Sequence, residues 1–259
     1  MLDALTAGAL EDAETRRGSL PYDELDALAR ASRTPIDVVA LLSQPVDGVH
    51  VIAEVKRASP SKGRIADIPE PAELAAAYAA GGASVISVLT EGRRFLGTLD
   101  DLRAVRGAVD VPVLRKDFLA SRYQLLEARA AGADLVLLIV AALDDATLAD
   151  LHAFATGLGL SVLVEVHDAD EVRRALAVGA RIVGVNTRDL QTFQMHPERF
   201  AELRPLIPEG VVAVAESGVQ GVDDVRAYRT AGAHAVLVGE ALVRDGDPAA
   251  RVAAFRSAS

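Results

Sequence analysis

The chain has 259 residues, half of them hydrophobic and a quarter charged, and this length can hold one large α/β domain with an ample core. Its formal charge of −10 argues against a nucleic-acid partner, because phosphate backbones bind to basic surfaces. The absence of cysteine excludes disulfides and thiolate metal sites. The five histidines lie far apart and lack the spacing of metal ligands, so we expect no metal.

Two features of the sequence bear on location. The stretch at residues 1–18 is too acidic for a signal peptide. The longest apolar run, Leu135–Leu143, is about half as long as a membrane-spanning helix requires. We therefore expect a cytoplasmic protein without a membrane partner, present as a monomer or a weak homo-oligomer.

The first 48 residues are helical in character and precede the first predicted strand. Because no low-complexity linker follows them, we expect a single domain over residues 1–259, with residues 1–48 as an N-terminal helical extension. The spacing of apolar side chains predicts short amphipathic segments packed on the domain. These side chains are Leu2, Leu5, Leu10, Leu25, Leu28, Val38, Val39, Leu41 and Leu42.

A weak internal repeat organises the rest of the chain. In each copy a helical stretch ends near a glycine, and an apolar, β-branched run follows at once. The glycine suits the position after a helix, where the chain turns left-handed, and the apolar run suits a parallel strand covered by helices. The copies span residues 74–90, 125–140, 172–186 and 225–239, with Gly82, Gly132, Gly179 and Gly232 at the helix ends.

Less regular units raise the number of predicted strands to eight. Their spacing of roughly 20–35 residues is the span of one βα unit. Eight such units favour a closed (β/α)8 TIM barrel over a doubly wound sheet, which would carry a G-x-G-x-x-G turn after its first strand. The predicted strands lie at residues 49–55, 84–89, 112–116, 134–140, 161–166, 182–186, 211–215 and 235–239.

Polar side chains gather at the carboxyl ends of these strands, where such barrels build their active sites. In the first strand Glu54 and Lys56 share a face, because side chains two apart along a strand point the same way. Any one such group could be a salt bridge that caps the barrel, but the set predicts a single polar mouth. The other strand ends carry Arg115, Lys116 and Asp117, then Glu165, then Asn186, Thr187 and Arg188, then Glu216 and Ser217, and finally Glu240.

The last two strand ends carry a separate signal. Ser217-Gly218 and Gly239-Glu240 supply small residues whose backbone amides can approach a ligand, and a short helix can begin at Glu240. The loops after strands seven and eight form the usual phosphate site of such barrels. We therefore expect phosphate here, with the Glu240 amide turned inward and its carboxylate turned away, although Gly218 could simply make a turn.

Seven ordered motifs make the chain similar to the indole-3-glycerol-phosphate synthase family, from about residue 50 to the C-terminus. They are IAEVKRASPSKG, SVLTEGRRFLG, PVLRKDF, LVEVHD, VGVNTRDLQTF, AESGV and VLVGEAL. The resemblance implies a carbon–carbon lyase of tryptophan biosynthesis. Its substrate would be 1-(2-carboxyphenylamino)-1-deoxyribulose 5-phosphate, and its product indole-3-glycerol phosphate. CO2 and water would be released without a metal or organic cofactor.

The resemblance also implies a role for each site residue. Lys116 resembles the general acid of ring closure, and Glu165 the acid/base of the later step. Glu54 is similar to a second carboxylate near the departing hydroxyl, and Lys56 to a lysine that bridges the substrate anions. The remaining contacts implied are polar groups that orient the ring and its carboxylate (Asn186, Arg188 and Glu216) and apolar walls for the ring (Phe95, Phe118 and Leu190).

Three points stay open from the residues alone. A lysine works as an acid near neutral pH if burial and nearby cations lower its pKa, and Arg115 and Lys56 are the predicted neighbours of Lys116. The two phenylalanines could instead be ordinary core. Ser59, a predicted substrate contact, and Lys62 lie in a segment that could gate entry or form a solvated turn.

Two alternatives compete with the lyase. A sugar-phosphate isomerase on the same barrel would use an acid/base pair near strands one and five. A non-catalytic barrel subunit would have no need for the charges of Glu54, Lys116 and Glu165 in a pocket. In either enzyme reading the partner is a small phosphorylated molecule.

Overall fold

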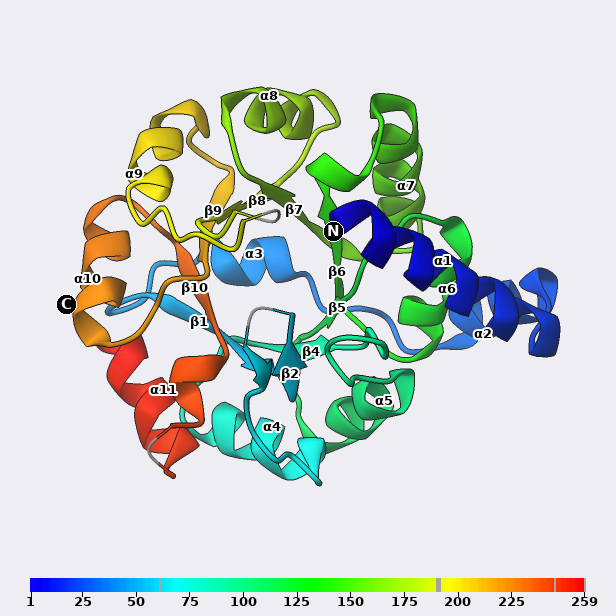
Figure 1. Ribbon diagram of the computed structural model, residues 1–259, viewed down its shortest axis with the longest axis horizontal. Coiled ribbons are helices and arrows are strands. Elements are labelled where there is room, and N and C mark those ends of the chain that lie inside the picture. The colour runs from blue at the N-terminus through cyan, green and yellow to red at the C-terminus, as the bar shows by residue number, and fades with distance from the viewer. Residues whose placement is uncertain (61, 190–191, 245, 259) are drawn as a thin grey trace.

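The computed structural model describes residues 1–60, 62–189, 192–244 and 246–258. Within these residues eight parallel strands close into a barrel in the order β1-β10-β9-β8-β7-β6-β5-β4 (Figure 1). The predicted barrel is therefore confirmed, and each strand ends within one residue of its expected bounds. The strands are β1 (His50–Val55), β4 (Val85–Leu89), β5 (Val113–Lys116), β6 (Leu135–Ile139), β7 (Ser161–Val166), β8 (Ile182–Asn186), β9 (Val212–Glu216) and β10 (Ala235–Val238).

Strand side chains alternate between the barrel interior and the layer beneath the surrounding helices. Ile52 and Leu114 belong to the interior cluster, whereas Ala53 and Val113 belong to the cluster that faces the helices. This alternation fixes what the strand ends present. Glu54 continues the interior row of β1, and the residue after Leu114 on the same face of β5 is Lys116.

Helices surround the barrel, and their ends carry clear capping signals (Figure 1). The side chains of Thr98, Ser121 and Asp144 accept hydrogen bonds from backbone amides in the first turn of the helix that follows. The four glycines of the repeat have φ between 82° and 93°, as predicted for residues that follow a helix. The helices are α4 (Pro71–Ala80), α5 (Leu99–Ala108), α6 (Arg122–Ala130), α7 (Asp145–Gly157), α8 (Ala169–Ala177), α9 (Arg199–Leu203), α10 (Val222–Thr230) and α11 (Pro248–Arg256), with 3-10 turns η1 (Val140–Ala142), η2 (Arg204–Leu206) and η3 (Glu240–Leu242).

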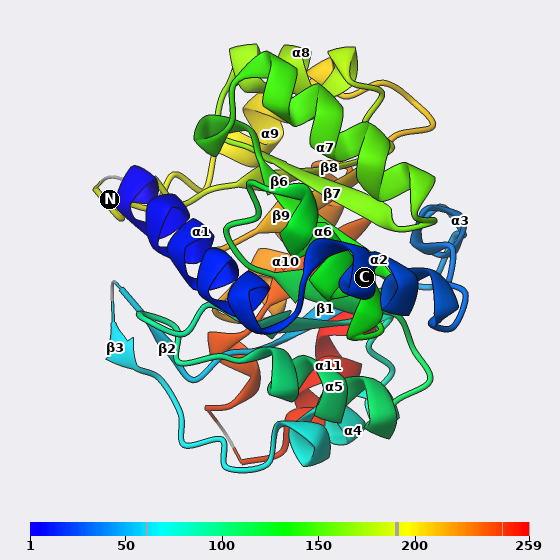
Figure 2. The ribbon, with the colours of Figure 1, turned by 90° about the vertical axis from the view of Figure 1, so that its right-hand side faces the viewer.

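The N-terminal segment covers both ends of the barrel (Figure 2). It forms α1 (Leu2–Ser19), α2 (Tyr22–Ala31) and α3 (Val38–Leu42). The α3 helix lies at the amino end, where the Val38 amide donates to Ser161 Oγ at 3.2 Å. The α1 helix crosses the opposite end. The expectation that Leu10 and Leu28 pack on the barrel is wrong, because these residues are 37% and 53% exposed.

The segment after β1 contains a short antiparallel hairpin, and the two readings of Ser59 and Lys62, as part of an entry gate or of a solvated turn, both stay predictions. The hairpin pairs β2 (Ala58–Ser59) with β3 (Gly63–Arg64), and the Ile65 amide donates to the Arg57 carbonyl at 2.8 Å. Within the part of the chain that is described, no helix is both long enough and apolar enough to cross a lipid bilayer.

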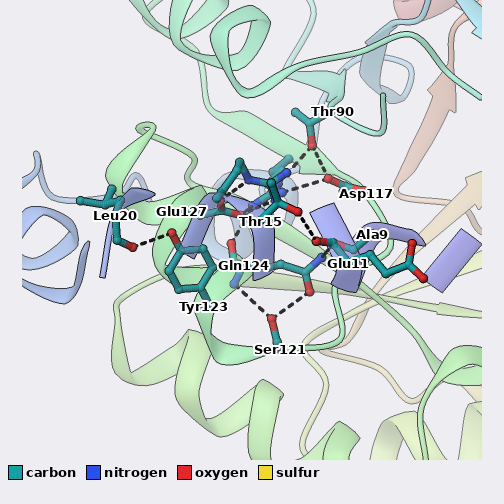
Figure 3. A network of polar contacts seen from close by, with 12 residues as sticks. Ala9, Glu11, Thr15, Leu20, Thr90, Asp117, Ser121, Tyr123, Gln124 and Glu127 are labelled. Carbon is teal, nitrogen blue, oxygen red and sulfur yellow. Dashed lines mark hydrogen bonds and ion pairs between the residues drawn. The ribbon is translucent and has the colours of Figure 1, made fainter. Parts of the chain in front are cut away.

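A buried polar network links α1 to β5 and α6 (Figure 3). The Arg115 guanidinium donates to Asp117 Oδ2 at 2.9 Å and to the Gln124 carbonyl at 2.7 Å, and it lies 3.3 Å from Glu127 Oε2. Arg16 of α1 reaches the same Glu127 carboxylate at 2.8 Å. These contacts hold the helix that covers the barrel against the strand that carries Lys116.

A second buried cluster lies at the amino end of the barrel, around Asp134. One oxygen accepts from Arg33 Nη1 at 2.6 Å and the Ile36 amide at 2.7 Å. The other accepts from Arg106 Nη1 and the Val113 amide, both at 2.9 Å. A fully buried carboxylate with these partners joins the chain before α3 to α5 and to the first residue of β5.

We expect Asp134→Ala to lower the free energy of unfolding by about 2–4 kcal/mol, because it removes the buried carboxylate partner of Arg33 and Arg106 and leaves two amides unpaired. Any activity at the polar mouth should be unchanged in the folded protein, since Asp134 lies at the opposite end of the barrel. Asp100→Ala, which removes an exposed pair with Arg103, is the matched control and should cost less than about 1 kcal/mol. Denaturant unfolding compares the two, and equal losses would contradict the assigned role of Asp134.

Candidate active site

Five polar side chains that the sequence placed at the strand ends meet in one cluster, and four of them, Glu54, Lys116, Glu165 and Asn186, line the pocket. Lys116 Nζ of β5 lies 3.6 Å from Glu54 Oε2 of β1, 3.4 Å from Glu216 Oε2 of β9 and 4.0 Å from Glu165 Oε2 of β7. Asn186 of β8 donates to Glu165 Oε1 at 3.1 Å. Parallel strands bring their carboxyl ends to one edge, so residues far apart in sequence form a single cluster.

The ammonium groups and carboxylates of this cluster set each other's protonation. Burial would raise the pKa of Glu54, but Lys56 at 2.7 Å and Lys116 lower it overall. Burial would lower the pKa of Lys116, but the charges of Glu54, Glu216 and Glu165 raise it well above the ordinary value. The sequence-based expectation of a lowered pKa for Lys116 is therefore wrong for the free enzyme.

Arg115 does not face this pocket, contrary to expectation. It directly precedes Lys116 in a strand, so its side chain points to the opposite face, toward α6. There its guanidinium, 1% exposed, pairs with Asp117 and Glu127. Arg115 therefore holds the outer face of β5. Inside the pocket, Lys56 is the cation that contacts the same Glu54 carboxylate as Lys116.

Glu165 and Glu216 are driven to different protonation states. Burial and the charge of Glu165 raise the pKa of Glu216 to about 8, although Lys116 opposes this. Burial would raise the pKa of Glu165, but His167, Lys116 and Asn186 lower it to about 2. These opposite shifts favour a proton on Glu216 over one on Glu165, and the carboxylates of Glu54 and Glu165 then balance the ammonium groups of Lys56 and Lys116.

The orientation of the Asn186 amide is fixed by its neighbours. Its Oδ1 accepts from Ser217 Oγ at 2.9 Å and from the Arg188 amide at 3.0 Å. Because the oxygen is already engaged by donors, the amide nitrogen is the atom that faces Glu165. Ser217 itself has φ +67°, a left-handed conformation unusual for a residue with a side chain.

Apolar groups form the rest of the pocket lining. The rings of Phe95 and Phe118 lie 6.1 Å apart and are tilted by 46°. Glu91 fixes the loop that carries the first ring, because Oε2 accepts from the Phe95 amide at 2.9 Å. The lining also contains Leu2 and Leu5 of α1. The predicted contact Leu190 lies outside the described residues.

The phosphate site expected after β9 and β10 has the necessary small residues. Gly218 has φ +82°, and an ideal Cβ there would lie 2.8 Å from Tyr228 Oη. A Cβ on Gly239 would lie 2.9 Å from Glu54 Oε1. The Glu240 carboxylate accepts from Lys62 Nζ at 2.6 Å and from Arg244. The predicted short helix is the single 3-10 turn η3. Ser59 and Arg188 line the pocket beside this end.

Sequence reasoning missed two kinds of site residue. Phe193 lines the pocket from an irregular loop, where no periodic pattern could mark it. His167 follows Glu165 by two residues, and its Nε2 lies 3.4 Å from Glu165 Oε1. The rule that placed Glu54 and Lys56 on one face would have found His167, had it been applied to the motif LVEVHD.

Comparisons with known proteins find relatives over the whole chain. The family model described as indole-3-glycerol phosphate synthase matches residues 2–255. The indole-3-glycerol phosphate synthase of Leifsonia xyli subsp. xyli is 56% identical over 256 residues, which cover 99% of this chain and 98% of that protein. The protein of the same name from Nocardioides sp. is 57% identical over 248 residues, 96% of this chain and 95% of that one.

Solved structures share the fold at low sequence identity. The 3-hexulose-6-phosphate synthase from Salmonella typhimurium has a TM-score of 0.67 at 18% identity and covers 81% of this chain and 98% of its own. Thiamine phosphate pyrophosphorylase from Pyrococcus furiosus has a TM-score of 0.63 at 15% identity, with 86% and 97% covered. At these identities the likeness shows the barrel fold alone.

Gly184 of β8 tests the position of the Glu216 carboxylate. An ideal Cβ there would lie 2.0 Å from Glu216 Oε1 and 3.0 Å from Leu163 Cδ1. Gly184→Ala should therefore displace this carboxylate from Lys116, and we expect turnover to fall about tenfold to a hundredfold in steady-state assays. Gly157→Ala, at a helical position with no atom within 4 Å of the new Cβ, should keep full turnover. A Gly184→Ala enzyme as fast as the control would contradict the placement.

Proposed function

The chain belongs to the indole-3-glycerol phosphate synthase family, and on that premise we propose how its pocket residues divide the work of the reaction. The protein is a decarboxylating lyase of tryptophan biosynthesis that acts on a small phosphorylated molecule. It converts 1-(2-carboxyphenylamino)-1-deoxyribulose 5-phosphate to indole-3-glycerol phosphate with loss of CO2 and water. The family match favours this activity over the isomerase and the non-catalytic subunit.

Lys116 is the general acid of ring closure in this proposal. Its central position carries the assignment, since its Nζ lies within 4.0 Å of the carboxylates of Glu54, Glu165 and Glu216. The raised pKa keeps the ammonium charged in the free enzyme, so a proton is available at neutral pH. As the aryl carbon attacks the ketone, the oxygen becomes a strong base and takes that proton.

The carboxylates serve the later steps. Ring closure leaves a cationic iminium, which the negative charge of Glu54 and Glu165 stabilises in a water-poor pocket. Loss of CO2 returns an electron pair to the ring. Dehydration then requires a proton on the departing hydroxyl and a base for a ring proton. Glu165, ionised near neutral pH, is the acid/base of this step, and Glu54 lies beside the departing hydroxyl.

The ends of the substrate are held by separate groups. Lys56 bridges the substrate anions from the edge of the charged cluster, and Arg188 binds the carboxylate of the ring. Phe95 and Phe118 pack against the ring faces. The phosphate lies at the strand ends of Gly218, Gly239 and Glu240, with Ser59 on the other side. A cytoplasmic location, a monomeric or weakly oligomeric state, the single-domain organisation and the lack of a nucleic-acid partner stay predictions.

We expect Lys116→Met to reduce kcat by about 10²–10⁴ while KM changes by less than about tenfold, because a positioned proton donor is lost and the anion contacts remain. Lys116→Arg keeps the positive charge among the carboxylates but cannot easily release a proton, so it should be almost equally slow. Indole fluorescence, followed in EDTA with the ribulose-phosphate substrate, measures all three enzymes. Near-normal kcat for Lys116→Met would transfer the role of acid to Lys56.

We expect Gly218→Ala to raise KM severalfold, because its Cβ would meet Tyr228 Oη and shift the backbone that approaches the phosphate. Gly179→Ala is the matched control, since this glycine has the same φ of +82° but no atom within 4 Å of a new Cβ. Both variants should lose stability from the strained backbone, and Gly218→Ala should lose more because of the added contact with Tyr228. Sulfate soaked into crystals should bind at the Gly218 end. Equal KM values for the two variants, or sulfate elsewhere, would refute the assignment.

A further inference from the structure

His167 lies between a pocket carboxylate and a carboxylate outside the pocket. The residue follows β7 and immediately precedes Asp168, which caps α8. Its Nδ1 lies 2.9 Å from Glu171 Oε2, and the same oxygen accepts from the His167 amide at 2.7 Å. On the other side, Nε2 lies 3.4 Å from Glu165 Oε1, and this buried nitrogen has no other partner recorded among the described residues.

The distances from Lys116 do not by themselves explain why Glu165, rather than Glu216, would be ionised. Lys116 Nζ is nearer to Glu216 than to Glu165, at 3.4 Å against 4.0 Å. Lysine alone would therefore favour ionisation of Glu216 over Glu165. The proposed acid/base chemistry requires the reverse, since Glu165 must be the ionised member of the pair. The hydrogen bond from Asn186 to Glu165 Oε1 favours that order, and a positive charge beside the same oxygen would strengthen it.

We propose that His167 is a positioning residue whose imidazolium, held between Glu171 and Glu165, keeps Glu165 ionised and leaves the shared proton on Glu216. This inference rests on the proposed role of Glu165 as the acid/base. The imidazolium carries an N–H on each nitrogen, so it can face a carboxylate on both sides, which a neutral ring cannot do. His167 acts through Glu165 and does not itself contact the reacting atoms.

The charged groups around the ring support this state. Glu165 on its own strand and Glu171 on α8 together raise the pKa of His167 to about 10, although burial acts in the opposite direction. Of the two cations on α8, Arg174 is turned away toward the carbonyls of Val140 and Leu143, and Arg173 pairs with the exposed Asp170. From β8, the contact to the same Glu165 oxygen comes from the neutral Asn186. Across the pocket, Lys116 lies 4.0 Å from the Glu165 oxygen that does not face His167, so its charge acts on the imidazole through that carboxylate.

NMR of the ¹⁵N-labelled histidines tests the charge state without reference to activity. The chain has five histidines, so the His167 signals can be assigned by their disappearance in His167→Asn. We expect the ring to stay doubly protonated at pH 8. In Glu171→Gln, which leaves the pocket untouched, its pKa should fall by about one unit or more. A His167 ring that titrates near 6.5 in the unaltered protein would overturn the proposal.

The pH dependence of kcat/KM tests the consequence for catalysis. Its acidic limb reports the pKa of the group that must be ionised in the free enzyme. His167→Asn should move this limb upward by about one pH unit or more, and His167→Lys, which restores a cation, should move it back. His50→Gln alters a buried histidine at the opposite end of the barrel and should leave the limb in place. Every variant is assayed with the same substrate, so ionisation of the substrate does not contribute to the difference between their acidic limbs.

Two failures can be told apart. If Glu165→Gln keeps near-normal kcat, Glu165 is not the acid/base, and the proposed function of that residue fails. If Glu165→Gln is inactive while His167→Asn has an unshifted acidic limb, Glu165 is catalytic and His167 does not set its charge. A loss of activity in His167→Asn that is equal at every pH would also overturn the proposal, since it indicates a structural role only.

Discussion

The balance of charge at the mouth of the barrel is the constraint on which the rest depends. The side chains of Glu54, Glu165 and Glu216 are each at most 3% exposed, and Lys116 lies among them. Ionising all of these carboxylates beside Lys56 and Lys116 would leave an uncompensated buried charge, which is strongly unfavourable. A proton on Glu216 removes that excess. The same proton gives the site a neutral acid beside an ionised base.

The barrel produces this cluster through the alternation of its strands. The interior rows of β1 and β5 are apolar below the mouth, at Ile52 and Leu114, and each changes to a charged group at the mouth, Glu54 in β1 and Lys116 in β5. The outer rows do different work. Arg115 lies one residue from the proposed acid, yet it pairs with Asp117 and Glu127 on the outer face and secures β5 from outside.

The site is held under local strain and incomplete hydrogen bonding. Neither Glu216 oxygen has a hydrogen-bond partner recorded in the described part of the chain, and Ser217 adopts a left-handed backbone. Both features reduce stability, and Ser217 lines the pocket. The Asp134 cluster at the other end is fully paired, so the two ends of the barrel divide function and stability between them.

The sequence by itself determined the barrel and the membership of most of the pocket. Strand positions followed from apolar runs and from glycines such as Gly132, because these are local patterns that burial imposes on each βα unit. Glu54, Lys116 and Glu165 followed from strand ends. Only the tertiary structure decided that Lys116 has a raised pKa, because that direction is the difference between burial and several charges whose distances depend on the register between strands. It also decided that Leu2 and Leu5 line the mouth while Leu28 faces solvent, since periodicity marks an apolar face but not the surface that covers it.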